Sequence, residues 1–258
     1  MLLAGSLLFA CSLEYLSRDF GKNGGGGDIS DAGGSDQGQG APGGSYCATL
    51  SHQATFCDDF EKGLDPSWRT TAEGGGSVLP AKRAAAIRVP SGGTNAYAYL
   101  EKDFTQKAGG VSLEFALTAP SLAGQSKAYE TVRIELPNGG GTSQISLTLE
   151  DDSDTPDHLA ARVKEHHRYA DGGIKDSGFG VKVPFPIDSV VRVSLEITFG
   201  TPTRVVVAFD GSTNEGNLAV VISPASSAKV LLGIVQPELT NNGWDLLVDD
   251  VVIDLLAP

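Results

Sequence analysis

The sequence predicts an all-β domain, an antiparallel β-sandwich or jelly roll, that runs from about residue 46 to residue 258. The first observation is a set of short runs in which apolar and polar residues alternate, as in residues 191–197, and this pattern gives a strand one buried and one wet face. The second is that turn signals rich in Gly, Asn and Asp separate the runs. The third is that no long stretch has helical periodicity. Many short strands at this spacing favour a sandwich over a parallel α/β sheet.

The strand pattern is clearest in segments that share β-branched or alternating apolar residues. They span residues 111–118, 131–136, 144–150, 190–199, 203–210, 218–223, 229–235 and 246–255. The best candidate for a helix, residues 159–166, reads equally well as a strand.

The charge of the chain excludes one class of partner. Its formal net charge is -13 and its pI is about 4.6. We therefore expect no nucleic-acid partner, because phosphate binding needs a basic face. The three cysteines form no Cys-x-x-Cys or Cys/His cluster that would indicate zinc or redox chemistry.

The first 20 residues are expected to direct export. Residues 1–11 are apolar throughout, too short to span a bilayer and of the size of a secretory signal core. Their end, Leu8-Phe9-Ala10-Cys11, resembles a bacterial lipoprotein lipobox, although no Lys or Arg precedes the run. The resemblance implies lipidation at Cys11 and a protein anchored to the outer membrane or cell surface. The alternative is a buried or amphipathic helix with an inert Cys11 thiol.

Residues 21–45 are predicted to form a flexible linker. The stretch is rich in Gly, Ser and Asp and has almost no large apolar residue. Such a segment cannot bury enough surface to offset the entropy of ordering. It would let the following domain move above a membrane on a tether of roughly 25–30 Å.

The two ends of the domain carry a resemblance to a known superfamily. Near the start stands Phe56-Cys57-Asp58-Asp59-Phe60-Glu61, followed by Trp68, and near the end stands Asp249-Asp250-Val251-Val252-Ile253. These two motifs resemble those of the concanavalin A-like lectin/glucanase superfamily, and most of all its bacterial surface proteins. The resemblance implies two curved antiparallel sheets, a first strand paired with the last, and a concave face that often binds sugar.

Cys47 and Cys57 are predicted to form a disulfide. They lie close together at the start of the domain, and an exported protein meets oxidising conditions. The bridge would pin the start of the domain where the linker ends. The alternative is a pair of free buried thiols.

Glu130 and Glu135 are the first candidates for catalysis. Laminarinase-like members of the superfamily carry two glutamates on one strand in a pattern like E-x-D-x-x-E, and retaining hydrolysis needs their carboxyl groups about 5–5.5 Å apart. Here the central acid is missing, and Arg133 stands one place past it. Without a β-bulge, the two glutamates fall on opposite faces of the strand.

The same strand also resembles part of a lyase site. Arg133-Ile134-Glu135-Leu136 resembles the R-x-E-L strand of alginate-lyase-like jelly rolls. Those enzymes also use a Gln-x-His strand and a Tyr-rich closing motif. In this chain Gln144 is followed two places later by Ser146, and the closing strand has no matching Tyr. The alternative is a cross-strand Arg–Glu pair on a wet face.

The candidate ligand-binding residues are aromatic, cationic and imidazole side chains. They are Tyr129, Arg133, His166, His167 and Tyr169, and Trp68, Trp244, Tyr97 and Tyr99 could also stack on sugar rings. Neighbouring histidines on a strand point to opposite faces, so His166 and His167 are not expected to bind one metal. Aromatic residues of a sandwich are more often part of the core.

A structural calcium ion is the one candidate cofactor. Asp59 and Glu61 near the first strand, and Asp249 and Asp250 near the last, bring carboxylates to one seam, and hard cations prefer such oxygen ligands. In similar sandwiches a calcium ion can lie at that position.

The incomplete catalytic patterns favour binding over catalysis. We expect a lipid-anchored, non-catalytic surface protein that binds carbohydrate or another extracellular ligand. One alternative is a polysaccharide hydrolase or lyase, and another is a structural domain of the cell envelope. The ligand itself cannot be deduced from these residues, since a fold does not fix a function.

Overall fold

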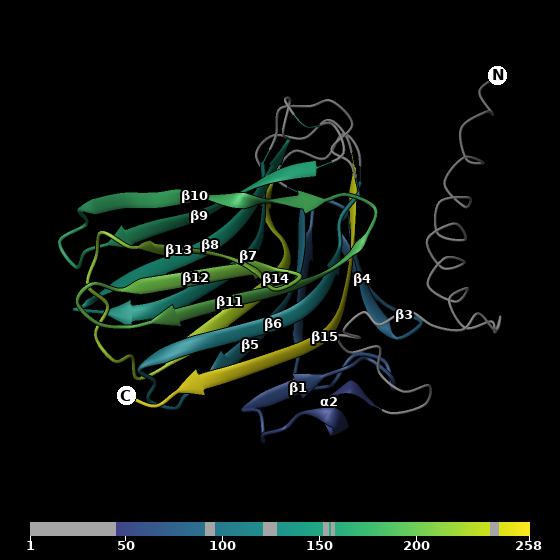
Figure 1. Ribbon diagram of the computed structural model, residues 1–258, viewed down its shortest axis with the longest axis horizontal. Helices are drawn as coiled ribbons and strands as arrows, with labels where there is room; N and C mark the ends of the chain where they lie inside the picture. Colours follow the sequence, from purple (N-terminus) through teal and green to yellow (C-terminus); the bar gives the residue numbers. More distant parts are fainter. Residues whose placement is uncertain (1–44, 91–95, 121–127, 152–154, 156–157, 238–242) are drawn as a thin grey trace, which may run out of the picture. The chain divides into compact units, whose positions relative to one another are not determined.

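The computed structural model describes residues 45–90, 96–120, 128–151, 155, 158–237 and 243–258. From Ser45 onward they form one compact unit, a sandwich of two antiparallel β-sheets (Figure 1). The predicted all-β, concanavalin A-like fold class is confirmed. The predicted export segment and linker, residues 1–44, lie outside the described residues.

The first sheet has eight strands and contains both the first and the last strand of the domain. Its order is β13 (Ser212–Asn217), β12 (Arg204–Phe209), β11 (Val190–Thr198), β6 (Gly110–Thr118), β15 (Trp244–Leu256), β4 (Ala84–Val89) and β3 (Ser77–Ala81), with β1 (Phe56–Asp58) also paired to β15. The pairing of β1 with β15, Phe56 opposite Ile253, agrees with the expected contact between first and last strands.

The second sheet has seven strands and carries the long central hairpins. Its order is β10 (Ile174–Pro186), β9 (His158–Arg168), β8 (Gly141–Asp151), β7 (Ala128–Asn138), β14 (Ala228–Pro237), β5 (Tyr97–Phe104) and β2 (Arg69–Glu73). The candidate helix at residues 159–166 is therefore part of strand β9.

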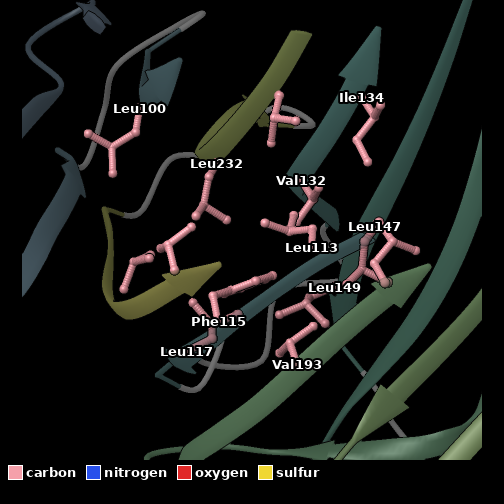
Figure 2. Close-up of a cluster of buried hydrophobic side chains, with 14 of the residues drawn as sticks. Leu100, Leu113, Phe115, Leu117, Val132, Ile134, Leu147, Leu149, Val193 and Leu232 are labelled. Atoms are coloured by element: carbon pink, nitrogen blue, oxygen red, sulfur yellow. The ribbon is translucent and has the colours of Figure 1, made fainter. Parts of the chain in front are cut away.

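The core fills the space between the sheets. Figure 2 shows Leu113, Phe115 and Leu117 of the first sheet pointing toward Val132, Ile134 and other apolar side chains of the second. Every second residue of β6 and of β11 is almost completely buried. Burying a side chain of this size contributes roughly 1.5–3 kcal/mol to folding. Alternation along each strand thus holds the two layers together.

One predicted strand is wrong. Residues 218–223 form a loop whose main-chain contacts are a single bridge between Gly200 and Ile222 and hydrogen bonds to other parts of the chain. The Leu218 and Ile222 amides bind the Thr203 carbonyl and hydroxyl. Leu218 and Ile222 are buried, so the apolar run covers the end of the core without pairing as a strand. Strand β13 lies just before it, in a polar segment that the apolar pattern could not reveal.

The opening motif is held together by one buried carboxylate. Asp58 accepts hydrogen bonds from the Phe60 amide at 2.9 Å, the Asp65 amide at 3.1 Å and the Trp68 indole N–H at 2.8 Å. Phe60 adopts a left-handed conformation with φ of 49°. The spacing of Asp58, Phe60 and Trp68 in the sequence therefore reflects a folded turn at the start of the domain.

The predicted disulfide is confirmed. Cys47 in the short helix α2 (Tyr46–Thr49) is bonded to Cys57 in β1. Further contacts hold the disulfide loop to strand β15, since Asp254 binds both the His52 ring at 2.8 Å and the Thr55 amide at 2.8 Å.

Among the described residues, no helix has the length and apolar character that crossing a membrane requires.

Removing the disulfide should destabilise the domain. The cysteines are separated by 10 positions, and a closed loop of that size restricts the unfolded chain by roughly 2–3 kcal/mol. We expect the double variant Cys47→Ser/Cys57→Ser to lose about that much free energy of unfolding in a urea titration. Cys11→Ser is the matched control and should not change it. A double variant as stable as the wild-type protein would contradict this account.

Candidate functional site

A groove lies on the outer face of the seven-stranded sheet, over strands β7 to β10. Its volume is about 430 Å³, within the usual range for small-molecule and sugar sites. Its lining is mostly polar: Ala128, Glu130, Arg133, Gln144, Ser146, Thr148, Lys164, Glu165, His166, Asp176 and Ser177. The groove therefore offers hydrogen-bonding groups from neighbouring strands to one ligand.

A β-bulge in strand β7 decides which side chains face this groove. Glu130 is opposite Thr148 on β8 and Val132 is opposite Leu147, so Thr131 is the extra residue. Thr131 is buried, and its hydroxyl donates a hydrogen bond to the Leu147 carbonyl at 3.0 Å. The extra residue moves Glu130 to the same face as Arg133 and Glu135.

The bulge brings the two candidate glutamates together. Regular alternation would set Glu130 and Glu135 on opposite faces, and the structure instead turns both outward with Arg133 between them. Val132, at the place of the central acid in the hydrolase pattern, points into the core, and Arg133, one place past it, faces outward. The outer face of β7 thus carries a Glu–Arg–Glu triad.

Ion pairs bind the triad tightly. The Arg133 guanidinium donates to both carboxylate oxygens of Glu130, with its Nη2 at 3.0 Å from Glu130 Oε2, and its Nη1 lies 3.8 Å from Glu135 Oε1. Gln144 Nε2 donates to the same Glu135 oxygen at 3.2 Å. Burial lowers the pKa of Arg133, but the hydrogen bond and charge of Glu130, with the charges of Glu135 and Tyr99, outweigh it and raise that pKa.

A histidine reaches the groove from the next strand. His166 on β9 is directly opposite Gln144 on β8, which is opposite Glu135 on β7. On its other side, Asp176 Oδ1 lies 2.7 Å from His166 Nδ1. A carboxylate at Nδ1 favours the tautomer with its proton on that nitrogen and leaves Nε2 as the basic atom. The lyase pattern has a histidine two places after the glutamine, where this chain has Ser146, and the sheet instead places His166 across from Gln144.

Opposite charges are paired between strands β8 and β9 beside the groove. Glu150 on β8 lies 3.5 Å from Arg162 and 3.5 Å from Lys164, both on β9. Lys164 also belongs to the groove lining. Lys164 and Asp176 have no signal in the sequence, because each becomes part of the site only through its cross-strand neighbour.

Two other candidates, Tyr129 and His167, point into the sandwich. Tyr129 is 3% exposed and its ring stacks on Trp244 at 3.9 Å between centroids. His167 is also 3% exposed, and its Nδ1 lies 2.8 Å from the Ser143 hydroxyl. The expectation that His166 and His167 face opposite sides is confirmed. Tyr169 is exposed beyond the end of β9, with its ring against His167.

The acidic residues at the seam of the first and last strands are engaged with donors and cations. Glu61 pairs with Arg83 at 2.5 Å, Asp250 with Arg192 at 3.3 Å, and Asp59 accepts hydrogen bonds from the Ser45 hydroxyl and the Cys47 amide. Within the described ranges, no group of three His, Cys, Asp or Glu residues is arranged to hold a metal ion. Calcium at this seam stays a prediction.

One seam carboxyl is strongly perturbed. Burial and the neighbouring charge of Asp250 raise the pKa of Asp249 to about 7. Asp249 and Asp250 lie at a β-bulge of β15, where Asp250 has a φ of 51° and its amide donates to Asp249 Oδ1 at 2.8 Å. Burial also raises the pKa of Asp250, against the opposing effect of Arg192.

Comparisons with known proteins agree with this architecture. No protein-family model matches the chain, and no curated protein matches it. A glycoside hydrolase family 16 endo-glucanase from Bacteroides ovatus is 12% identical, with a TM-score of 0.55 over 77% of this chain and 99% of that one. The PL-14 alginate lyase from Aplysia kurodai is 11% identical, with a TM-score of 0.54 over 77% of this chain and 93% of that one. At these identities the likeness shows the jelly-roll fold.

The raised pKa of Asp249 predicts a pH dependence of stability. Its pKa of about 7 lies above the ordinary 3.8 of the unfolded chain, so the stability that its proton contributes is complete below about pH 4 and is lost as pH rises through 7. We expect Asp249→Asn to be more stable than the wild-type protein at pH 8, by about 1–2 kcal/mol once solvent screening is allowed for. Urea titrations at pH 5 and pH 8 measure the difference.

The control for this experiment is Asp188→Asn, which changes an exposed aspartate and should keep the wild-type pH dependence. If Asp249→Asn lost stability between pH 5 and pH 8 as steeply as the wild-type protein, the carboxyl of Asp249 would not be the group responsible.

Proposed function

We propose that the domain binds a polysaccharide in the groove of the seven-stranded sheet and degrades it. The observation that carries the proposal is the bulge at Thr131, which gathers Glu130, Arg133 and Glu135 on one wet face beside Gln144 and His166. The fold supports it at a coarser level, since an endo-glucanase and an alginate lyase share the architecture. The proposal reverses the preference of the sequence analysis for a non-catalytic binder.

The side chains of the groove fit β-elimination on a uronate polysaccharide. In this reaction a base removes the proton next to the sugar carboxylate, a carbon–carbon double bond forms, and the glycosidic bond to the leaving sugar breaks. Arg133 and Gln144 would bind the carboxylate and make that proton more acidic. The carboxylate of the sugar would take the place of Glu130 or Glu135 as a partner of Arg133. His166, oriented by Asp176, would accept the proton at Nε2, and water would protonate the leaving oxygen.

Retaining hydrolysis is the second candidate reaction, and the shared face of Glu130 and Glu135 favours it. One carboxyl group would protonate the leaving oxygen while the other attacks the sugar and forms a glycosyl–enzyme bond, and water, deprotonated by the first carboxylate, would then break that bond. Arg133 lies between them and is paired with both. Hydrolysis would therefore require the guanidinium to move or to bind the substrate between the two acids.

The hypothesis that the domain binds a polysaccharide without cleaving it is supported by the same ion pairs. Glu130 and Arg133 already neutralise each other, and balanced charge with many hydrogen-bonding groups suits the hydroxyl groups of a neutral sugar. In that case the groove would bind a polysaccharide and release it unchanged.

Incubation with defined polysaccharides separates these possibilities. We expect the wild-type protein to depolymerise alginate or polyglucuronate and to form an unsaturated product that absorbs in the ultraviolet. His166→Ala and Arg133→Ala should each lower the rate by about 100-fold or more, the usual loss when a proton-transfer or charge-stabilising group is removed.

Hydrolysis would instead produce new reducing ends without an ultraviolet signal. In that case Glu130→Gln and Glu135→Gln should produce no new reducing ends. The matched control is Glu196→Gln, on strand β11 of the other sheet, which should retain full activity. Binding with no product from any polysaccharide would leave the non-catalytic reading. Full activity in all four groove variants would contradict the site.

We also propose that a lipid at Cys11 anchors the protein on the outside of the cell. The support is the lipobox-like end of the apolar run and the Gly-rich stretch that follows it. Cells fed a labelled fatty acid should incorporate label into the wild-type protein and not into Cys11→Ser. Equal labelling of both proteins, or of neither, would remove the anchor from this account.

A further inference from the structure

Two tyrosines form a stacked pair on the same outer face as the groove, two strands away. Tyr97 and Tyr99 alternate with the buried Ala98 and Leu100 on β5, so their rings point outward. The ring centroids are 5.7 Å apart and the planes are inclined by 26°. Other aromatic side chains in the described strands of this sheet, such as Tyr129 and Phe185, point into the core.

A glycine lies beside the pair on the strand that separates it from β7. Tyr99 is directly opposite Gly233 on β14, and β14 is the strand that lies between β5 and β7. Gly233 has a φ of 142°, and a Cβ there would lie 2.8 Å from the Ala98 carbonyl oxygen and 2.9 Å from both Ile87 Cδ1 and the Tyr99 Cα. Only glycine fits this position. The residue directly beside Tyr99 on β14 thus has no side chain.

The two regions also lie within electrostatic reach. The Tyr99 hydroxyl contributes to the raised pKa of Arg133, after the larger effects of burial, Glu130 and Glu135. Two strand spacings separate β5 from β7, which amounts to roughly 10 Å, or about two sugar units. An oligosaccharide held at Arg133 can thus reach the tyrosines as it crosses the strands.

On the side away from the groove, the hydroxyl group of Tyr97 is held by a polar neighbour. Glu73 on β2 is directly opposite Tyr97, and its hydrogen bond with the Tyr97 hydroxyl raises the pKa of that phenol to about 12. The ring of Tyr97 is thereby held in place at the surface. Rings held beside hydrogen-bonding groups match a sugar, which has an apolar C–H face and a rim of hydroxyl groups.

We propose that Tyr97 and Tyr99 form a sugar-binding subsite that receives the part of a polysaccharide chain extending beyond the groove. The inference rests on the proposed function and specifies its substrate as a chain long enough to span from Arg133 to β5. Its contribution is to binding, so it applies whether the groove cleaves the chain or only holds it.

Affinity electrophoresis with alginate, polyglucuronate, mixed-linkage β-glucan and laminarin tests the subsite. We expect at least one polymer to retard the wild-type protein, and Tyr97→Ala and Tyr99→Ala to bind that polymer about fivefold or more weakly, as expected for the loss of one aromatic contact. Tyr97→Phe and Tyr99→Phe keep the rings and should bind nearly as the wild-type protein. Leu79→Ala, at an exposed apolar residue on strand β3 of the other sheet, is the control and should bind as the wild-type protein.

Chain length gives a second readout. Oligosaccharides too short to reach from Arg133 to β5 should bind both alanine variants as they bind the wild-type protein, and longer ones should not. Wild-type affinity of both alanine variants for the retarding polymer would overturn the subsite, and so would a wild-type protein that none of the polymers retards. Tyrosine-dependent binding without any cleavage would overturn the proposed degradation and leave the subsite in place.

Discussion

The burial of one face of each sheet against the other is the constraint on which the rest of this structure depends. It requires every strand to alternate inward and outward side chains, and it forbids a strand to slip by one residue, because a slip would turn its apolar set toward water. On β7 the inward set after the bulge is Val132, Ile134 and Leu136, all fully buried. Within this constraint, a side chain can change face only where the ladder gains an extra residue.

Bulges supply that extra residue at both polar sites of the domain. In β7, Thr131 turns Glu130 toward Arg133, and its own buried hydroxyl is satisfied by the Leu147 carbonyl. In β15, the bulge at Asp249 and Asp250 leaves two carboxyl groups beside each other, where burial raises both pKa values and the charge of Asp250 adds to the rise at Asp249. The same backbone device gathers opposite charges in the groove and like charges at the seam. The first arrangement suits a ligand site, and the second makes stability sensitive to pH.

The parts of the site that could be predicted are those that lie on one strand. Glu130, Arg133 and Glu135 were candidates because a motif of residues close in sequence can be compared directly with a known pattern. Asp176 and Lys164 could not be found in this way, since each joins the site through pairing with a neighbouring strand. His166 was a candidate from its cluster, but its position opposite Gln144 depends on register. Tyr97 and Tyr99 were named with the other aromatic residues, and only burial separates them from Tyr129 and Trp244.

By itself the sequence determined that this chain folds as a β-sandwich and where about half of its strands run, and it predicted that the first and last strands meet and that Cys47 and Cys57 are bonded. The sandwich and its strands follow from alternation and turn residues, which are local properties of a chain, and the pairing of the first and last strands is what the resemblance of two short motifs to a known superfamily implies. The tertiary structure decided which residues share a face of β7, that residues 218–223 cover the core as a loop, and that side chains from β7 to β10 line one groove. Those outcomes depend on one extra residue in the ladder between β7 and β8 and on the register between neighbouring strands. The alternation of apolar and polar residues along one strand gives no information about either.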